Sequence, residues 1–301
     1  MNKIVSKLKR TFNSTSPLYV ILFILLLLYA VFIIYLLLWG ILTSVKTPDD
    51  FRINVVGFPK GKWAFSNFSY VISKFYVDVV LNGGIPAKKY IEDMILYTIL
   101  YSVGGAFIST IVPCVVAYAV SKFNYKFNAI IKGIVIVTMI LPIVGSAPAE
   151  IDLLRKLHLY DSIVGNWIQK FHFLGMYFLV FLSAFKTIPK EYYEAAEIDG
   201  ANEFKIMTRI VFPLVKTVFT TIMLIKFVEY WNDYQTPLLY LPAHPTLAYG
   251  VYSLSVTNIN GMNNVPMRMA GCVILLVPIL IIFISFRKKI MGNISLGGIK
   301  E

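Results

Sequence analysis

The chain has 301 residues, of which 57% are hydrophobic, and its mean hydropathy is +0.71. A soluble domain has about 45–50% apolar residues, so this composition excludes an ordinary soluble protein. The formal net charge of +12 comes without a cluster of basic and aromatic residues on a soluble domain. We therefore exclude nucleic acid as a partner and expect the positive charge to contact anionic membrane lipid.

Apolar stretches along the chain predict six membrane-spanning helices. They cover residues 17–42, 94–120, 133–149, 171–188, 214–234 and 269–286. The first stretch has no charged residue and would be about 39 Å long as a helix, against a hydrocarbon core of about 30 Å. The fourth and fifth stretches are weaker, because they contain charged residues. The sequence predicts an all-α membrane protein with six transmembrane helices and a single domain over residues 1–301.

Lys and Arg residues set the expected orientation of these helices. With six spans both termini lie on one side, and the segments on that side have the higher density of basic residues. We therefore expect cytoplasmic N- and C-termini. This orientation puts residues 43–90 outside as an irregular loop and residues 236–267 outside as a polar loop. Residues 150–169 have the pattern of an amphipathic helix at the outer interface.

Residues 187–213 read TIPKEYYEAAEIDGANEFKIMTRIVFP and predict a helix, a turn and a second helix on the cytoplasmic side. Pro189 suits the first turn of a helix. Gly200 suits its end, because glycine adopts a left-handed conformation at little cost. The loop closes at Pro213, before the next span.

The first helix of this loop has an acidic face. Glu191 and Glu194 lie in its early turns, where negative charge is favoured, and Ala195 and Ala196 leave space for close approach. Such a ridge suits a basic groove on a partner protein. A solvated charged face is the alternative interpretation of the same pattern.

Charged residues inside the fifth span form a second candidate site. Lys226, Glu229 and Asp233 lie within it, and a charge at the centre of a bilayer costs about 2.5–3.5 kcal/mol on insertion scales. Lys226 and Glu229 are three residues apart and are positioned to pair on one helix face. A structural ion pair is one interpretation. The other is a solute pathway, whose candidate residues are Lys226, Glu229, Tyr230, Trp231, Asn232 and Asp233.

The loop and its surroundings resemble a known family. The matching residues are Glu194-Ala195-Ala196, Asp199-Gly200-Ala201, Phe204, Pro213, Trp231-Asn232-Asp233, Pro237-Leu238 and Met269-Ala270. Together they resemble the EAA loop region of binding-protein-dependent ABC importer permeases. Within that family they are most similar to the carbohydrate-uptake group, and in particular to the shorter permease of the maltose transporter.

The resemblance implies a type I ABC importer permease fold in the bacterial plasma membrane. It makes residues 189–213 the cytoplasmic coupling loop to an ATPase. The residues that would make this contact are Glu191, Glu194, Ala195, Ala196, Asp199, Gly200, Ala201 and Phe204. It also implies three kinds of protein partner: a second, homologous permease that completes a heterodimer, two ATP-binding subunits, and an extracellular solute-binding protein. The cargo would be a sugar or oligosaccharide.

No motif for enzymatic chemistry is present in the sequence. The phosphate-binding pattern G-x-x-x-x-G-K-[ST] does not occur, and neither does H-E-x-x-H or C-x-x-C. We therefore expect no catalytic residue, metal site or cofactor in this chain, with ATP and Mg²⁺ used by the partner ATPase. Two alternatives remain, which are an ion-coupled secondary carrier that uses Lys226, Glu229 and Asp233, and a membrane scaffold or export component.

Overall fold

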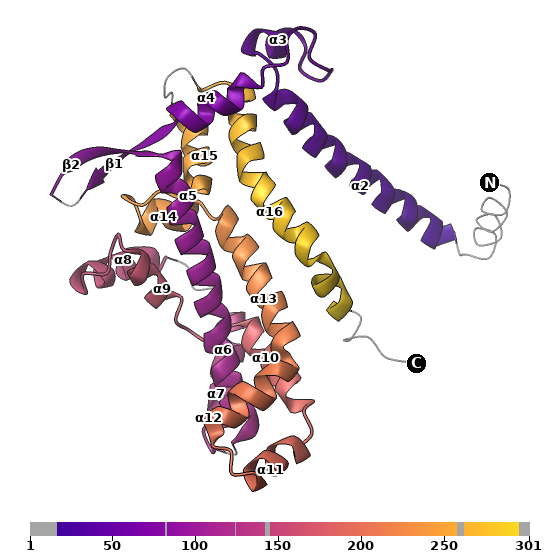
Figure 1. Cartoon of the computed structure of the whole chain (residues 1–301), viewed down its shortest axis with the longest axis vertical. Helices are drawn as coiled ribbons and strands as arrows, with labels where there is room; N and C mark the ends of the chain where they lie inside the picture. The colour runs from indigo at the N-terminus through magenta and orange to yellow at the C-terminus, as the bar shows by residue number, and fades with distance from the viewer. Residues whose placement is uncertain (1–16, 82, 124, 142–144, 258–261, 295–301) are drawn as a thin grey trace. The chain divides into compact units, whose positions relative to one another are not determined.

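A computed structural model of the chain describes residues 17–81, 83–123, 125–141, 145–257 and 262–294. The described part is mostly helical (Figure 1). It divides into two compact units. The first unit contains residues 1–71 and 261–274, and the second contains residues 72–260 and 275–301.

The first unit begins with a long apolar helix. Helix α2, Pro17–Ser44, has 28 residues without a charge, and its apolar side chains are almost all exposed. A helix that is apolar all round is stable in lipid rather than in water. Two short helices follow, α3 at Pro48–Ile53 and α4 at Ser66–Lys74. The buried Lys46 fixes the chain between α2 and α4, because its ammonium donates to the Asn54 carbonyl at 2.7 Å.

Two long helices form the frame of the second unit. The first is the 91–122 helix, which consists of α5 (Ile91–Ile99), η1 (Leu100–Gly104) and α6 (Gly105–Lys122). The second is the 203–232 helix, which consists of α12 (Glu203–Lys205), η2 (Ile206–Val211) and α13 (Phe212–Asn232). The η1 and η2 segments have π-helical hydrogen bonding. Such segments widen a helix locally and are frequent at functional sites.

The remaining helices are shorter, except for α16. They are α7 (Asn128–Ile140), α8 (Ala147–Lys156), α9 (Ile163–Gln169), α10 (Met176–Lys186), α11 (Glu191–Ile198), α14 (Gln235–Tyr240) and α15 (Leu247–Val256). Helix α16, Val265–Ile294, begins in the first unit and continues in the second. The predicted polar loop over residues 236–267 thus contains two helices, α14 and α15.

The expected all-α class needs one correction. Strands β1, Tyr76–Leu81, and β2, Ile85–Tyr90, form an antiparallel hairpin inside the segment predicted to be an irregular loop. The alternation of buried Val77 and Val79 with outward-facing residues is typical of a strand with one covered face. Gly83 and Gly84 both have positive φ angles and make the turn.

Four described helices are long and apolar enough to cross a membrane, namely Pro17–Ser44, Ile91–Lys122, Glu203–Asn232 and Val265–Ile282. The other two predicted spans fall on shorter apolar helices. The helix expected over residues 133–149 is interrupted, because α7 ends at Ile140 and α8 begins at Ala147. The helix expected over residues 171–188 begins only at Met176, after Gly175 with φ +120°. The two termini lie outside the described residues.

The core of the second unit lies where α6, α10 and α13 pack together. Aromatic rings interlock there, with the ring centroids of Phe181 and Phe219 6.3 Å apart and those of Tyr118 and Phe185 5.7 Å apart. Close packing of this kind, rather than the hydrophobic effect, holds helices together in lipid. The core therefore fixes the long helices relative to α10 and to the loop that follows it.

A glycine in α9 tests this packing. A Cβ atom at Gly165 would overlap the backbone carbonyl of Leu159, so Gly165→Ala should lower the free energy of unfolding by about 1–3 kcal/mol. Thermal unfolding of the purified protein measures the effect. Gly133→Ala in α7 is the matched control, because a Cβ atom there has no neighbour within 4 Å. Equal melting temperatures for the two variants would contradict the packing described for α9.

Candidate functional site

The loop after α10 has the helix, turn and helix that its sequence predicts. Helix α11 begins at Glu191 and ends at Ile198, and Gly200 follows with φ +73°. The backbone N–H of Ala201 donates to the Ala196 carbonyl at 3.0 Å and closes the turn. The Asn202 side chain then accepts a hydrogen bond from Lys205 N and caps α12. We call residues 191–205 the elbow.

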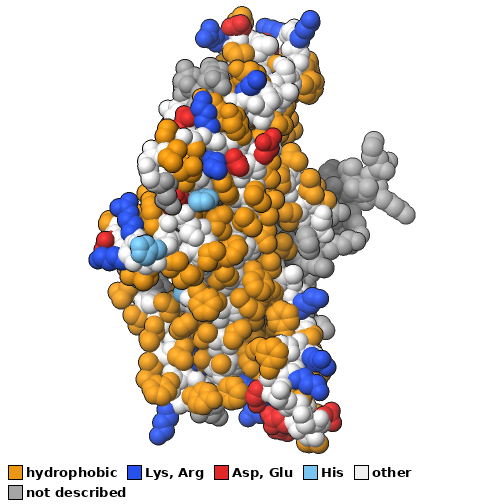
Figure 2. Space-filling model, turned by 60° about the vertical axis from the view of Figure 1, so that its left-hand side comes forward, with side chains coloured by type: hydrophobic (Ala, Val, Ile, Leu, Met, Phe, Trp, Pro, Cys, Tyr) orange, Lys and Arg blue, Asp and Glu red, His pale blue; other side chains and the backbone are white. Residues whose placement is uncertain are grey.

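The elbow has one buried and one exposed face. Ala196 is buried in the core of the second unit, and Ala201 is half-buried beside it. The exposed residues include five acids and two apolar side chains, and they are Glu191, Glu194, Glu197, Asp199, Glu203, Ile198 and Phe204. Ala195 and Gly200 are also exposed. Figure 2 shows acidic side chains gathered at the end of the second unit where α11 lies in Figure 1.

A lysine outside the loop contacts the elbow. Lys122, the last residue of α6, places its ammonium 3.2 Å from the Glu197 carboxylate and 2.6 Å from the Glu203 carboxylate. Lys122 was not predicted as part of the site, because it lies 81 positions before Glu203. No local pattern shows that the end of α6 and the elbow meet.

Lys226, Glu229 and Asp233 lie at the C-terminal end of α13. Lys226 and Glu229 form the expected pair at 2.9 Å, and the Lys226 ammonium also lies 5.1 Å from the centre of the Tyr177 ring. Asp233 does not join this pair. Its carboxylate accepts hydrogen bonds from the Tyr101 hydroxyl at 2.6 Å and from Thr236 N at 3.0 Å.

The three other predicted pathway residues have separate contacts. The Tyr230 hydroxyl is hydrogen-bonded to the Ser109 hydroxyl at 2.7 Å. The Trp231 indole donates to the Leu275 carbonyl in α16 at 3.0 Å, three residues before Pro278. Asn232 is exposed and donates to a backbone carbonyl of its own helix. The structure therefore brings together Lys226, Glu229 and Tyr230, while Trp231 and Asn232 point elsewhere.

A buried lysine, which was not predicted from the sequence, completes this region. Lys170, directly after α9, is 8% exposed, and its ammonium lies 4.5 Å from the ring centres of both Tyr101 and Tyr230. It donates to the Asn166 amide oxygen at 2.7 Å. Gly105 makes room for this side chain, because a Cβ atom there would lie 3.1 Å from it. We call Lys170, Tyr101, Tyr230 and Asp233 the cation cage.

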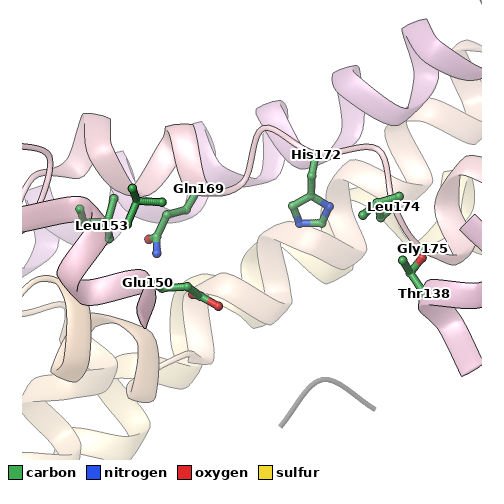
Figure 3. Close-up of a pocket in the computed structure, with 8 residues that line it drawn as sticks. Thr138, Glu150, Leu153, Gln169, His172, Leu174 and Gly175 are labelled. Atoms are coloured by element: carbon green, nitrogen blue, oxygen red, sulfur yellow. The ribbon is translucent and has the colours of Figure 1, made fainter. Parts of the chain in front are cut away.

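A pocket of about 560 Å³ is formed by residues of α7, α8, α9 and the connector from α9 to α10 (Figure 3). It is lined by Thr138, Glu150, Leu153, Leu154, Gln169, His172, Leu174 and Gly175. The Gln169 amide, the His172 ring and the Glu150 carboxylate extend into the same space from α9, the connector to α10, and α8. In the sequence, Gln169 directly precedes Lys170 and His172 follows it by two positions. The volume is typical of ligand sites, which span about 300–1,000 Å³.

Comparison with known proteins identifies the family. Residues 109–291 match the family described as the inner membrane component of binding-protein-dependent transport systems. The chain belongs to this family. Its members are transporter permeases and not enzymes, and this permease is a multi-pass protein of the plasma membrane.

Two curated relatives and one solved structure illustrate the similarity. The permease is 26% identical to the arabinooligosaccharide transport permease AraQ of Bacillus subtilis, over 92% of this chain and 93% of that protein. It is also 26% identical to the trehalose/maltose permease MalG of Thermococcus litoralis, over 75% of this chain and 80% of that one. A chain of a bacterial ABC transporter that imports the acidic polysaccharide alginate shares the fold. The TM-score is 0.72 at 23% identity, and 90% of this chain and 95% of that chain are covered.

The cation cage predicts a strong effect of one hydroxyl group. Tyr101→Phe removes the hydrogen bond to the Asp233 carboxylate, and a bond to a charged group contributes about 1.5–3 kcal/mol. We expect the free energy of unfolding of the purified permease to fall by about that amount. Tyr29→Phe is the control, because that side chain is 65% exposed on α2. Equal stability of the two variants would show that the Tyr101 hydroxyl does not hold the cage together.

Proposed function

We propose that this permease is one of two membrane subunits of an ATP-driven importer for a sugar or oligosaccharide. The observation that carries the proposal is the elbow, because it combines exposed acids with exposed apolar side chains on the loop that follows α10. The family match and the similarity to two sugar permeases support it. The partners would be a homologous permease, two ATP-binding subunits and an extracellular solute-binding protein.

In this proposal the elbow docks on an ATP-binding subunit on the cytoplasmic side. Glu191 and Glu194 are exposed, and among the described residues neither forms an ion pair, so both are available to a basic groove. Ile198 is 87% exposed and Phe204 is 70% exposed, which is unfavourable in water but suits a covered contact. ATP and Mg²⁺ would bind to that partner, and its closure would move the elbow.

The solute path would pass the pocket and the cation cage. The pocket offers an amide, an imidazole, a carboxylate and a hydroxyl group, together with the side chains of Leu153, Leu154 and Leu174. Such groups can exchange hydrogen bonds with the hydroxyl groups of a sugar, while the leucines contact its C–H faces. The cage lies at the junction of α9 with the 91–122 and 203–232 helices, so movement of those helices would change the path.

The complete complex provides the test of this function. Copurification should recover an ATPase and a second permease with this chain, and uptake into proteoliposomes should require both ATP and the loaded binding protein. Uptake by this chain reconstituted alone, driven by an ion gradient, would instead support a secondary carrier that uses Lys226, Glu229 and Asp233. ATPase activity that does not change when the binding protein is added would favour a scaffold or an export component.

The elbow predicts the effect of a charge reversal. Glu194→Lys should leave the complex assembled but reduce solute uptake to background, because a basic groove would repel the new charge. Uptake and ATP hydrolysis are measured on the same proteoliposomes. Asp49→Lys is the matched control, since this side chain is 87% exposed in α3 and its pair with Arg52 is a surface pair of little energetic weight. Full uptake by the Glu194→Lys complex would make the acidic face a solvated surface.

The pocket predicts a smaller effect on uptake. Gln169→Ala and His172→Ala should each lower the maximal uptake rate about fivefold, which corresponds to the loss of one hydrogen bond. The affinity of the binding protein for the solute is measured separately, because it resides in another polypeptide. Asp152→Ala on α8 is the control, since its exposed side chain pairs with Lys156 and does not line the pocket. Unchanged uptake by both pocket variants would place the solute path elsewhere.

A further inference from the structure

Lys122 lies between the two arms of the elbow. Its ammonium pairs with Glu197 in the last turn of α11 and with Glu203 in the first turn of α12. Gly200 lies between these two acids and has a positive φ angle. A single cation at the end of the 91–122 helix therefore connects both sides of the turn.

The surroundings of Lys122 distinguish it from an ordinary surface lysine. Its side chain is only 10% exposed, although the two glutamates are half-exposed. The rings of Tyr193 and Phe123 lie 5.3 and 5.6 Å from its ammonium. Exposed ion pairs contribute little because water screens them and the side chains lose freedom. Here the lysine is already confined by its neighbours, so both the screening by water and the loss of side-chain freedom are smaller.

Removal of the lysine would also reverse the sign of the local interaction. Glu197 and Glu203 both lie within 3.2 Å of one nitrogen atom, so the two carboxylates are close to each other. Without the cation between them, like charges would face each other across the turn and would push the arms of the elbow apart. The geometry of the elbow therefore depends on Lys122.

The two arms continue into different parts of the second unit. Helix α11 is attached to the core through the buried Ala196, and Glu203 is the first residue of the 203–232 helix. Lys122 is the last residue of the 91–122 helix. These two long helices supply Tyr101 and Tyr230 to the cation cage, and Asp233 directly follows the second helix.

We propose that Lys122 is the positioning residue that joins the elbow to the 91–122 helix, so that displacement of α11 moves both long helices together. This inference rests on the proposed function, because it assumes that a partner displaces α11. Lys122 touches neither solute nor nucleotide in this role. It transmits movement by holding Glu197 and Glu203 at a fixed distance from the end of α6.

The test uses the complete complex with its ATPase, second permease and binding protein. We expect Lys122→Met to lower the number of solute molecules imported per ATP hydrolysed by about tenfold, an effect within the range that residues of coupling networks show. Lys122→Arg should keep most of the coupling, because it retains the charge. A merely structural role would lower uptake and ATP hydrolysis together and would leave their ratio unchanged.

Two control variants separate the contacts of Lys122 with Glu197 and Glu203 from other effects of substitution nearby. Lys126→Met removes an exposed positive charge four residues later, in the segment that leads to α7. Tyr118→Phe removes a buried hydroxyl group, one turn before Lys122, that has no hydrogen-bond partner among the described residues. Both variants should have the wild-type ratio of solute to ATP.

A charge exchange provides the second line of evidence. In a Glu197→Gln background, Lys122→Glu should abolish coupling, and the further change Glu203→Lys should restore at least part of it. Wild-type coupling in Lys122→Met, or no recovery in the exchanged variant, would overturn the inference. If the Lys122→Met complex fails to assemble, the coupling ratios of the exchanged variant and of Lys122→Arg test the inference instead. A wild-type complex without ATP-dependent uptake would overturn the proposed function itself, which is a separate outcome.

Discussion

Backbone groups inside a bilayer have no water to bond with, and this constraint governs where the polar side chains of this permease lie. Interruptions of regular α-helix leave carbonyl groups that need another donor. The Trp167 indole donates to the Leu100 carbonyl, the first residue of η1, at 3.1 Å, and the Trp231 indole donates to α16 shortly before Pro278. The break between α9 and α10 holds Lys170. Irregular backbone and polar side chains therefore occur together at these three places.

The same two helices carry both candidate sites. In the 91–122 helix, Tyr101 and Lys122 are about 30 Å apart along the axis, and in the 203–232 helix Glu203 and Tyr230 are about 40 Å apart. If α11 is displaced as proposed, these two helices would carry the movement from the elbow to the cation cage. The π-helical segments η1 and η2 are the places where each helix departs from regular hydrogen bonding.

Local signals in the sequence were sufficient to predict the helix, turn and helix of the elbow and the Lys226–Glu229 pair, because both depend on residues a few positions apart. The contacts of Lys122 with Glu203, of Lys170 with Tyr101 and of Tyr101 with Asp233 join residues 81, 69 and 132 positions apart. No periodicity in one sequence contains that information. The hairpin was not predicted for a different reason. Its strands have only six residues each, and they lie within a long segment of mixed polar and apolar residues. Hydropathy alone also made the predicted span over residues 133–149 too long, because α7 ends at Ile140.

Exposed apolar surface has two different meanings in this chain. Helix α2 exposes leucine, isoleucine and phenylalanine side chains on every side, as lipid requires. The elbow exposes Ile198 and Phe204 among five acids, and that mixture does not suit the interior of a membrane, where unpaired carboxylates are costly. It does not suit open water either, because two large apolar side chains would remain hydrated. A protein surface with a basic rim and an apolar hollow satisfies both requirements, so the composition of the elbow itself argues for a partner protein on that face.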